Sequence, residues 1–99
     1  MQSLTKNQMR LRFVNDPYHA WMIVPLAAIH ARDMENEISM HSYVCHKTGN
    51  AYLEEDVDAQ KFLVRIQQEG IEPVIDDISV GEDNPIRRLP RFRPSPESF

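Results

Sequence analysis

The chain is poor in three features that define large classes of protein: it has one cysteine, three glycines and no long apolar run among its 99 residues. The longest apolar run, residues 20–29, has ten members, roughly half of the ~20 that a membrane-spanning helix needs. Cys45 has no second cysteine for an internal disulfide, so stability must come from packing. The glycines are too widely spaced for a phosphate-binding loop. We therefore expect no membrane span, no disulfide scaffold and no glycine-loop nucleotide site.

The composition is that of one folded domain. Apolar residues make up 41% and charged residues 26% of the chain, far from the balance of a disordered segment. A chain of this length supports one hydrophobic core, and we expect a single domain over residues 8–93 with flexible termini at 1–7 and 94–99. The N-terminus lacks the basic start and apolar stretch of a secretory signal, so we expect a cytoplasmic protein.

Hydrophobic periodicity in the first third of the chain predicts two strands and a helix. Side chains alternate along residues 9–14 with the period of a half-buried strand. The unbroken apolar run at 20–24 predicts a central strand that is covered on both faces. Pro25 suits the first turn of a helix, which we expect over 26–33.

A strand, a turn and a second strand are predicted next. Alternation indicates a third strand over residues 38–45. Glycine and asparagine at 47–50 accept the positive φ angles of a tight turn. The returning strand is expected at 51–53, so this part of the chain forms a hairpin.

The second half predicts one helix and one edge strand. The acidic run 54–58 suits a helix N-terminus, an apolar stripe at helical spacing follows, and Gly70 suits a left-handed cap. Pro73 places the next strand, 71–75, at a sheet edge, and from Asp76 onward the prolines predict turns. The elements predict an α+β fold: a small, mainly antiparallel sheet of about four or five strands packed against two helices, in the order β-β-α-β-β-α-β.

The segment 41–46 contains the residue types that bind zinc. On a strand, His41 and Cys45 share a face but lie about 13 Å apart, too far for one ion, and His46 points to the other face. A thiol nucleophile at Cys45 would need an orienting group and an oxyanion pocket, which no segment indicates. We therefore predict no metal site, no cofactor and no catalytic residue, and interpret the segment as solvent-facing strand.

Three large side chains, Tyr18, His19 and Trp21, precede the apolar strand. Trp21 is expected in the core, as large aromatic residues usually are. His19 is interpreted as satisfying a local backbone group. An acid or base role for His19 is the alternative.

Charge is unevenly distributed along the chain: residues 54–83 carry ten acidic and two basic residues, whereas 84–99 carry four basic and one acidic. Such asymmetry marks an interaction surface or two segments that neutralise each other. The acidic run lacks the glycine and the ligand spacing of a calcium loop, so helix capping by Asp56 or Asp58 is the structural interpretation and partner binding is the functional one. The predicted partner-contact residues are Glu54, Glu55, Asp56, Asp58, Asp76 and Asp77.

The basic C-terminal segment has two interpretations. Its arginines are interleaved with Leu89 and Phe92, a pattern that suits phosphate contacts. The net charge of -4 would repel a polyanion, however, and pairing with the acidic segment would fold residues 84–93 back onto the domain. The arginines predicted to contact a phosphate or an acidic partner are Arg87, Arg88, Arg91 and Arg93.

Several segments form one pattern across the chain. They are His19-Ala20-Trp21 running into Val24-Pro25, Ile38-Ser39 through Ser42-Tyr43, Ala51-Tyr52-Leu53-Glu54-Glu55-Asp56 with Asp58 and Phe62, and Pro85-Ile86-Arg87. The pattern, over about residues 10–93, resembles a family of small uncharacterised proteins encoded by bacteriophages, prophages and plasmids. The chain departs from it at Ala20, where glycine is usual, at His41, and at Leu89-Pro90, where an aromatic is common. The resemblance implies a mobile-element origin and a bacterial host, and it carries no established activity.

Function is predicted from the acidic surface and the resemblance together. The main hypothesis is a non-enzymatic protein that binds a host protein or ribonucleoprotein complex and inhibits or modulates nucleic-acid processing or defence, as anti-CRISPR proteins do. The physical reason is that an acidic ridge competes with a phosphate backbone for a basic groove. Two alternatives stay open: a nucleic-acid-binding accessory protein that uses the arginine-rich segment, and a small enzyme centred on His19 or Cys45.

Overall fold

The computed structural model describes residues 7–93 and has an α+β fold, as predicted. The strands are β1 (Gln8–Asn15), β2 (Ala20–Pro25), β3 (Tyr43–Cys45), β4 (Asn50–Glu54) and β5 (Glu72–Ser79), the α-helices are α1 (Leu26–His30) and α2 (Asp58–Gln68), and two short 3₁₀ helices occupy Glu35–Glu37 and Pro85–Arg88. The order differs in detail from the predicted one, because the 3₁₀ helices add two elements. No helix in residues 7–93 is long and apolar enough to cross a membrane.

The predicted flexible termini lie almost wholly outside the described residues, which leave out 1–6 and 94–99. Asn7 is the exception. Its carbonyl oxygen accepts a hydrogen bond of 2.7 Å from the Glu72 N–H. Residue 7 is therefore joined to the start of β5 and belongs to the fold, although it was expected in a flexible terminus.

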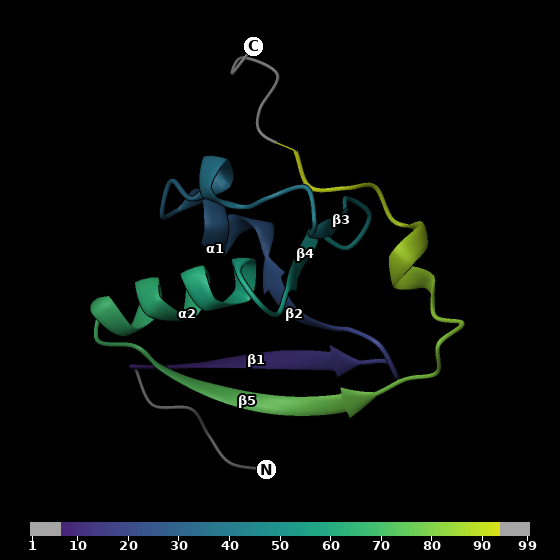
Figure 1. Cartoon of the computed structure of the whole chain (residues 1–99). Helices are drawn as coiled ribbons and strands as arrows, with labels where there is room; N and C mark the ends of the chain where they lie inside the picture. The colour runs from purple at the N-terminus through teal and green to yellow at the C-terminus, as the bar shows by residue number, and fades with distance from the viewer. Residues whose placement is uncertain (1–6, 94–99) are drawn as a thin grey trace.

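The five strands form one sheet in the order β3-β4-β2-β1-β5. Neighbouring strands are antiparallel except β1 and β5, which run parallel over eight residue pairs, and Figure 1 shows their two arrows pointing the same way. Five of the six residues of β2 are buried, which confirms the predicted central strand. Pro73 lies in β5 at the edge of the sheet, as predicted.

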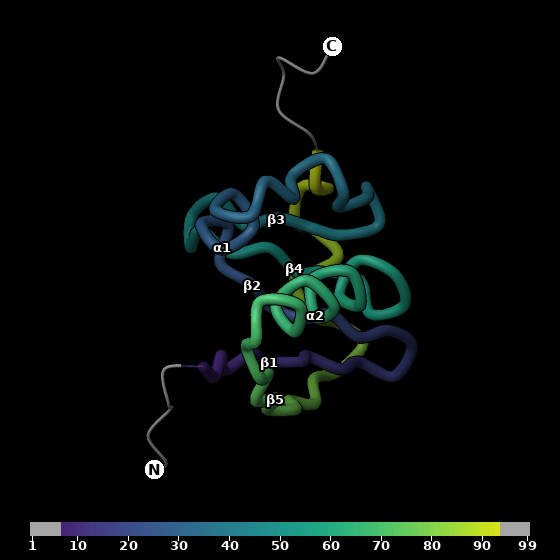
Figure 2. Tube along the Cα trace, turned by 90° about the vertical axis from the view of Figure 1, so that its left-hand side faces the viewer, coloured from purple at the N-terminus to yellow at the C-terminus, as the bar shows by residue number. Residues whose placement is uncertain are grey.

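Each face of the sheet packs against a different part of the chain. The two helices cover one face, and Figure 2 shows α2 in front of the strands with the yellow C-terminal segment behind them. The main core includes Leu11, Met22, Leu53, Ile29, Phe62 and Ile66, and a smaller core on the opposite face includes Val14, Trp21, Ile23, Tyr43 and Ile86. Burying one aliphatic or aromatic side chain of this kind stabilises the fold by about 1.5–3 kcal/mol.

Two predicted boundaries are wrong because backbone pairing and local turns override the sequence pattern. The strand predicted over 71–75 continues to Ser79, because the whole of β5 pairs with β1 and the Val80 N–H donates to the Asn15 carbonyl at 2.7 Å. The helix predicted over 26–33 ends at His30. Asp33 has a φ of 53°, a left-handed conformation in which an α-helix does not continue.

The third predicted strand, 38–45, is also mostly wrong, and the cause is the buried carboxylate of Asp58. Its Oδ2 atom accepts hydrogen bonds from the Ser39 N–H at 3.0 Å, the Ser39 hydroxyl at 2.7 Å and the Ser42 hydroxyl at 2.6 Å. Serine side chains that bond in this way draw the backbone out of an extended ladder. Only Tyr43–Cys45 remains a strand.

The Asp58 cluster also joins this turn to the sheet and to α2. The Ser42 hydroxyl accepts a hydrogen bond of 2.9 Å from the Glu54 N–H, at the end of β4. Asp58 is the first residue of α2, where the helix dipole favours a negative charge. Asp58 is 0% exposed, so the prediction that it contacts a partner is wrong.

Substitution of Asp58 by alanine is expected to destabilise the protein by roughly 3 kcal/mol, because buried serine donors lose their acceptor. The measurement is the free energy of unfolding from urea titration. Asp56→Ala, an exposed change two residues away, is the matched control and should stay within about 0.5 kcal/mol of the parent. Equal effects of the two substitutions would contradict a structural role for Asp58.

Candidate functional site

The turn between β1 and β2 is organised by Asp16. Its Oδ1 atom accepts hydrogen bonds from the backbone N–H of Tyr18 at 2.8 Å and of His19 at 2.7 Å. Aspartate favours such turns because its short side chain satisfies backbone donors two and three residues ahead. The turn therefore fixes where the backbone of His19 lies at the start of β2.

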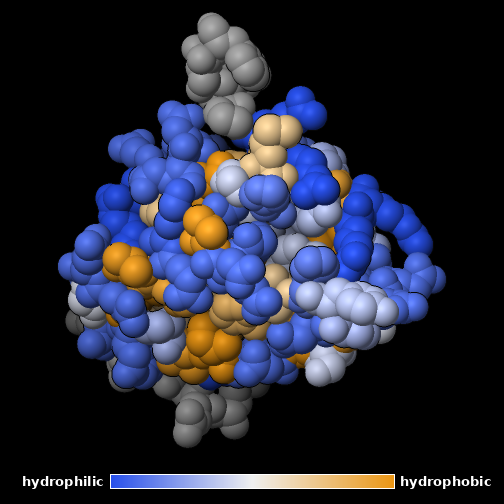
Figure 3. All heavy atoms as spheres, viewed as in Figure 1, coloured by the Kyte–Doolittle hydropathy of each residue, from blue (hydrophilic) through white to orange (hydrophobic). Residues whose placement is uncertain are grey.

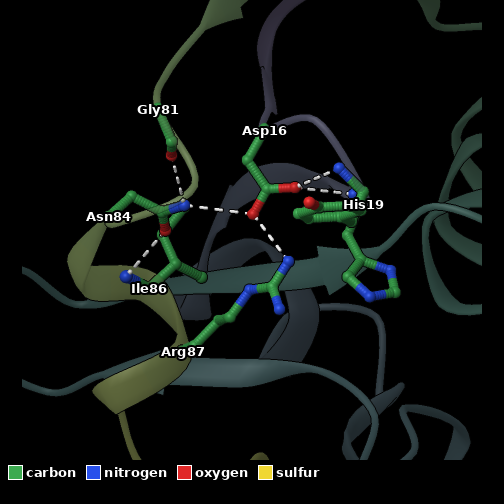
Figure 4. A network of polar contacts seen from close by, with 7 residues as sticks. Asp16, His19, Gly81, Asn84, Ile86 and Arg87 are labelled. Carbon is green, nitrogen blue, oxygen red and sulfur yellow. Dashed lines mark hydrogen bonds and ion pairs between the residues drawn. The ribbon is translucent and has the colours of Figure 1, made fainter.

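The other oxygen of the same carboxylate reaches the C-terminal segment. Asp16 Oδ2 accepts hydrogen bonds from the Asn84 side-chain amide at 3.1 Å and from the Arg87 guanidinium at 2.8 Å (Figure 4). The Asn84 side-chain oxygen Oδ1 accepts a hydrogen bond from the Ile86 N–H and so begins the second 3₁₀ helix. The Asp16 side chain is 0% exposed, so this contact joins two distant parts of the chain inside the molecule.

The surroundings of Asp16 shift its pKa. Burial disfavours the charged carboxylate and would raise the pKa. The hydrogen bonds from the Tyr18 and His19 N–H groups, from Arg87 and from Asn84 outweigh burial and hold the pKa of Asp16 well below its ordinary value. The carboxylate is therefore charged at neutral pH and fully paired.

A polar pocket of about 390 Å³ opens beside this network. Trp21 and Tyr43 supply aromatic walls, and His19 and His41 contribute imidazoles from two different segments. Figure 4 shows the His19 ring directed away from the Asp16 carboxylate, whose bonds to this residue involve the backbone only. Sequence reasoning considered the two histidines separately and gave no signal that they share a pocket.

Two of the four predicted arginines line this pocket. The Arg87 guanidinium lies 5.8 Å from the centroid of the Trp21 ring while it pairs with Asp16. The Arg91 guanidinium lies 4.6 Å from the centroid of the Tyr43 ring and donates to the Met40 carbonyl at 3.2 Å. Both cations are thus held on aromatic faces, an arrangement that stabilises a charged guanidinium.

The other two predicted arginines do not line the pocket. Arg88, in the second 3₁₀ helix, pairs with Asp83 at 2.8 Å on the open surface, where an ion pair adds little stability. Arg93 is exposed at the end of the described chain. Residues 84–93 were expected to pair with the acidic segment 54–83. Arg88 does so through Asp83, whereas Arg87 pairs with Asp16, which lies outside that segment.

Three of the predicted acidic contacts also line the pocket. Glu54 is half-buried, and its Oε1 atom accepts hydrogen bonds from the N–H groups of Asp56 and Val57, the latter at 2.9 Å. These two hydrogen bonds fix the turn between β4 and α2. Glu55 and Asp56 are exposed at the rim of the pocket, where their charges face solvent.

The remaining predicted acidic contacts lie elsewhere on the sheet. Asp76 and Asp77 lie on β5, which β1 and β2 separate from β4. Asp76 pairs with Arg10 on the neighbouring strand at 2.9 Å, and Asp77 is exposed. The six predicted acidic residues therefore form no continuous ridge: three line a pocket, one is buried and two lie on a distant strand.

Cys45 is not part of the pocket. It lies at the end of β3, and a hydrogen bond from the Thr48 hydroxyl lowers the pKa of its thiol. Within residues 7–93, no group of three or more histidine, cysteine, aspartate or glutamate side chains is placed to hold a metal ion. The chemistry that the pocket residues offer is binding of charged groups and, through the two imidazoles, proton transfer.

Comparisons with known proteins find no match. Neither the protein-family models, nor the curated proteins, nor the solved structures include one that is similar to this chain.

The contribution of Asp16 to stability is expected to depend on pH. A carboxylate whose pKa is depressed by folding stabilises the protein above its unfolded-state pKa of about 3.9, and this contribution is lost as the pH falls toward the folded-state value. Asp16→Asn should lower the urea midpoint at neutral pH, and the difference from the parent should shrink below about pH 4. Asp77→Asn, at an exposed carboxylate, is the control. A difference in urea midpoint between Asp16→Asn and the parent that stays constant in acid would contradict this role of Asp16.

Proposed function

We propose that this protein is a non-enzymatic binding protein of a phage, prophage or plasmid that docks on a nucleic-acid-processing or defence complex of its bacterial host and inhibits or modulates it, as anti-CRISPR proteins do. On this proposal the protein acts in the host cytoplasm, and its contact surface is the rim of the polar pocket. The observation that carries the proposal is the charge of this rim. Glu55 and Asp56 are exposed there.

The arithmetic of formal charges supports an acidic contact surface. Glu54, Glu55 and Asp56 contribute three negative charges to the pocket lining, and Arg87 and Arg91 contribute two positive charges. Arg87 is neutralised by the buried carboxylate of Asp16. The excess is therefore negative when the histidines are neutral, and a cleft of one sign attracts a surface of the other.

The rest of the surface supports a polar, reversible complex. On the face shown in Figure 3, most of the surface is hydrophilic, and the hydrophobic atoms lie in small separate patches. Obligate interfaces are larger and more apolar than this. A basic groove that normally holds nucleic acid is a partner of suitable chemistry, because the rim carboxylates would occupy it in place of phosphates.

The arginine contacts weigh against direct nucleic-acid binding. Arg87 and Arg91 are engaged by Asp16, by Met40 and by aromatic rings, and the chain as a whole carries a charge of -4. Phosphate binding needs side-chain cations that are free to contact phosphates and displace the counterions condensed on the nucleic acid. Titration with labelled DNA and RNA at low salt separates this alternative from the proposal.

Reversal of the rim charges is expected to abolish the salt-sensitive part of binding. The host partner is first isolated by pull-down and mass spectrometry, and affinity is then measured with the purified complex at low and high salt. Glu55→Lys with Asp56→Lys should weaken binding by about tenfold or more at low salt. Glu82→Lys with Asp83→Lys changes the net charge by the same amount away from the pocket and is the control. Equal affinities for the two double variants, or affinity that is flat with salt, would overturn the proposal.

A second candidate function, a small enzyme, is favoured by one observation: His19 and His41 line the same pocket as two arginines. Paired imidazoles perform acid and base catalysis, and guanidinium groups stabilise anionic intermediates. If the protein acts only by binding, the His19→Ala and His41→Ala variants should inhibit the host complex to the same extent as the Cys45→Ser variant. Loss of inhibition by the histidine variants with unchanged affinity for the complex would favour the enzyme.

A further inference from the structure

The two edges of the sheet differ in whether another segment pairs with the edge strand. At the β3 edge, the C-terminal segment supplies the missing partner: the Val44 N–H donates to the Pro90 carbonyl at 2.9 Å, and the Phe92 N–H donates to the Ser42 carbonyl at 2.8 Å. At the other edge, no strand or bridge within residues 7–93 pairs with the outer side of β5. The sheet is thus closed on one side and open along an eight-residue strand on the other.

The register of β5 shows which of its backbone groups face outward. The Glu72 N–H donates to the carbonyl of Asn7, directly before β1, and the Val80 N–H donates to the carbonyl of Asn15 in β1, each at 2.7 Å. Backbone groups alternate in direction along a strand. The even-numbered residues of β5 therefore pair with β1, and the odd-numbered residues present their backbone groups to the outside. Three outward donors result, at Ile75, Asp77 and Ser79.

Pro73 fits this alternation. It occupies an outward-facing position, where the N–H that proline lacks would take no part in the pairing with β1. The open edge is therefore compatible with Pro73 at its start and offers an uninterrupted set of donors and acceptors from residue 75 onward. An edge of this kind is a template for a further strand.

The side chains along the edge indicate what kind of strand would fit. Ile75 is 38% exposed and Ile78 is 37% exposed, and they lie on opposite faces of the sheet. Asp76 and Asp77 lie between them, again one on each face. Residues 72–83 include five acidic and no basic residues. A strand that carries both apolar and basic side chains would find complementary neighbours on both faces.

We propose that the outer edge of β5 binds an extended, basic segment of a partner protein by adding it to the sheet as a sixth strand. A second copy of this chain is a poorer occupant. Antiparallel pairing of two β5 strands would bring the Asp76 and Asp77 carboxylates of both copies together, and like charges across a strand pair are destabilising. Lysine or arginine side chains of an added strand, placed opposite Asp76 and Asp77, are attracted to these carboxylates instead.

This surface is distinct from the pocket rim that the proposed function uses. The β1 and β2 strands lie between β5 and β4, and the pocket lining includes no residue of β5. Strand addition at β5 therefore does not depend on Glu55 or Asp56. The two proposals are therefore independent, and the failure of one would leave the other standing.

The test uses a blocked octapeptide of alternating lysine and valine, titrated into the isotopically labelled full chain. Chemical shifts and hydrogen exchange of the backbone amides are read by NMR. We expect the amides of Ile75, Asp77 and Ser79 to shift and to exchange more slowly as they become hydrogen-bonded. A peptide of alternating glutamate and valine is the control and should not bind. Shifts confined to the pocket rim would overturn the proposal.

Two substitutions at one position separate backbone pairing from charge attraction. Asp77→Asn removes the charge and should weaken peptide binding by about threefold. Asp77→Pro also removes the outward N–H while leaving the bonds to β1, and should weaken binding by about tenfold or more. If Asp77→Pro does not fold, Ser79→Pro removes another outward donor at the end of the strand. Proline variants that bind as well as Asp77→Asn, or sedimentation that shows the parent pairing with itself, would overturn the proposal.

Discussion

The buried carboxylate of Asp16 is the interaction on which the candidate site depends. Through its two oxygens it joins the turn after the first strand to Asn84 and Arg87, about seventy residues later. Without this link the second 3₁₀ helix would lose the polar contacts that hold Arg87 beside Trp21. Arg91 is held separately, because the backbone of Pro90 and Phe92 bonds to Val44 and Ser42. A paired buried carboxylate is a specific connector, because Asp16 without its partners would be a desolvated charge.

A second aspartate, Asp58, joins a different set of segments. It connects the Ser39 turn, the Ser42 hydroxyl and the first turn of α2. Two of the acidic residues therefore serve to assemble the fold, and a count of charges along the sequence overstates the acidic surface by that amount. The carboxylates that remain exposed, such as Glu55 and Asp77, lie in separate places and define two surfaces.

The parts of the fold that local patterns control could be predicted, and those that distant contacts control could not. The apolar run of β2, Pro25 before α1, the tight turn at Gly49 and the edge position of Pro73 all follow from properties of a few neighbouring residues. The length of β5 depends on β1, more than sixty residues away in the chain, and the loss of strand at Ser39 depends on Asp58. The pocket was missed for the same reason, because His19, His41 and Arg87 come from three segments that only the folded sheet brings together.

The parallel pairing of β1 with β5 also sets an order of events during synthesis. Of the five described strands, β1 leaves the ribosome first and its outer partner last, since Gln8 pairs with Glu72 and Asn15 with Ser79. Contacts between residues so far apart in sequence form slowly. Until residue 79 has been made, the nascent chain presents β1 as an open strand with Leu11 and Phe13 on one side, a state prone to aggregation. Rapid completion of the last third of the chain therefore shortens the time for which this strand edge stays unpaired.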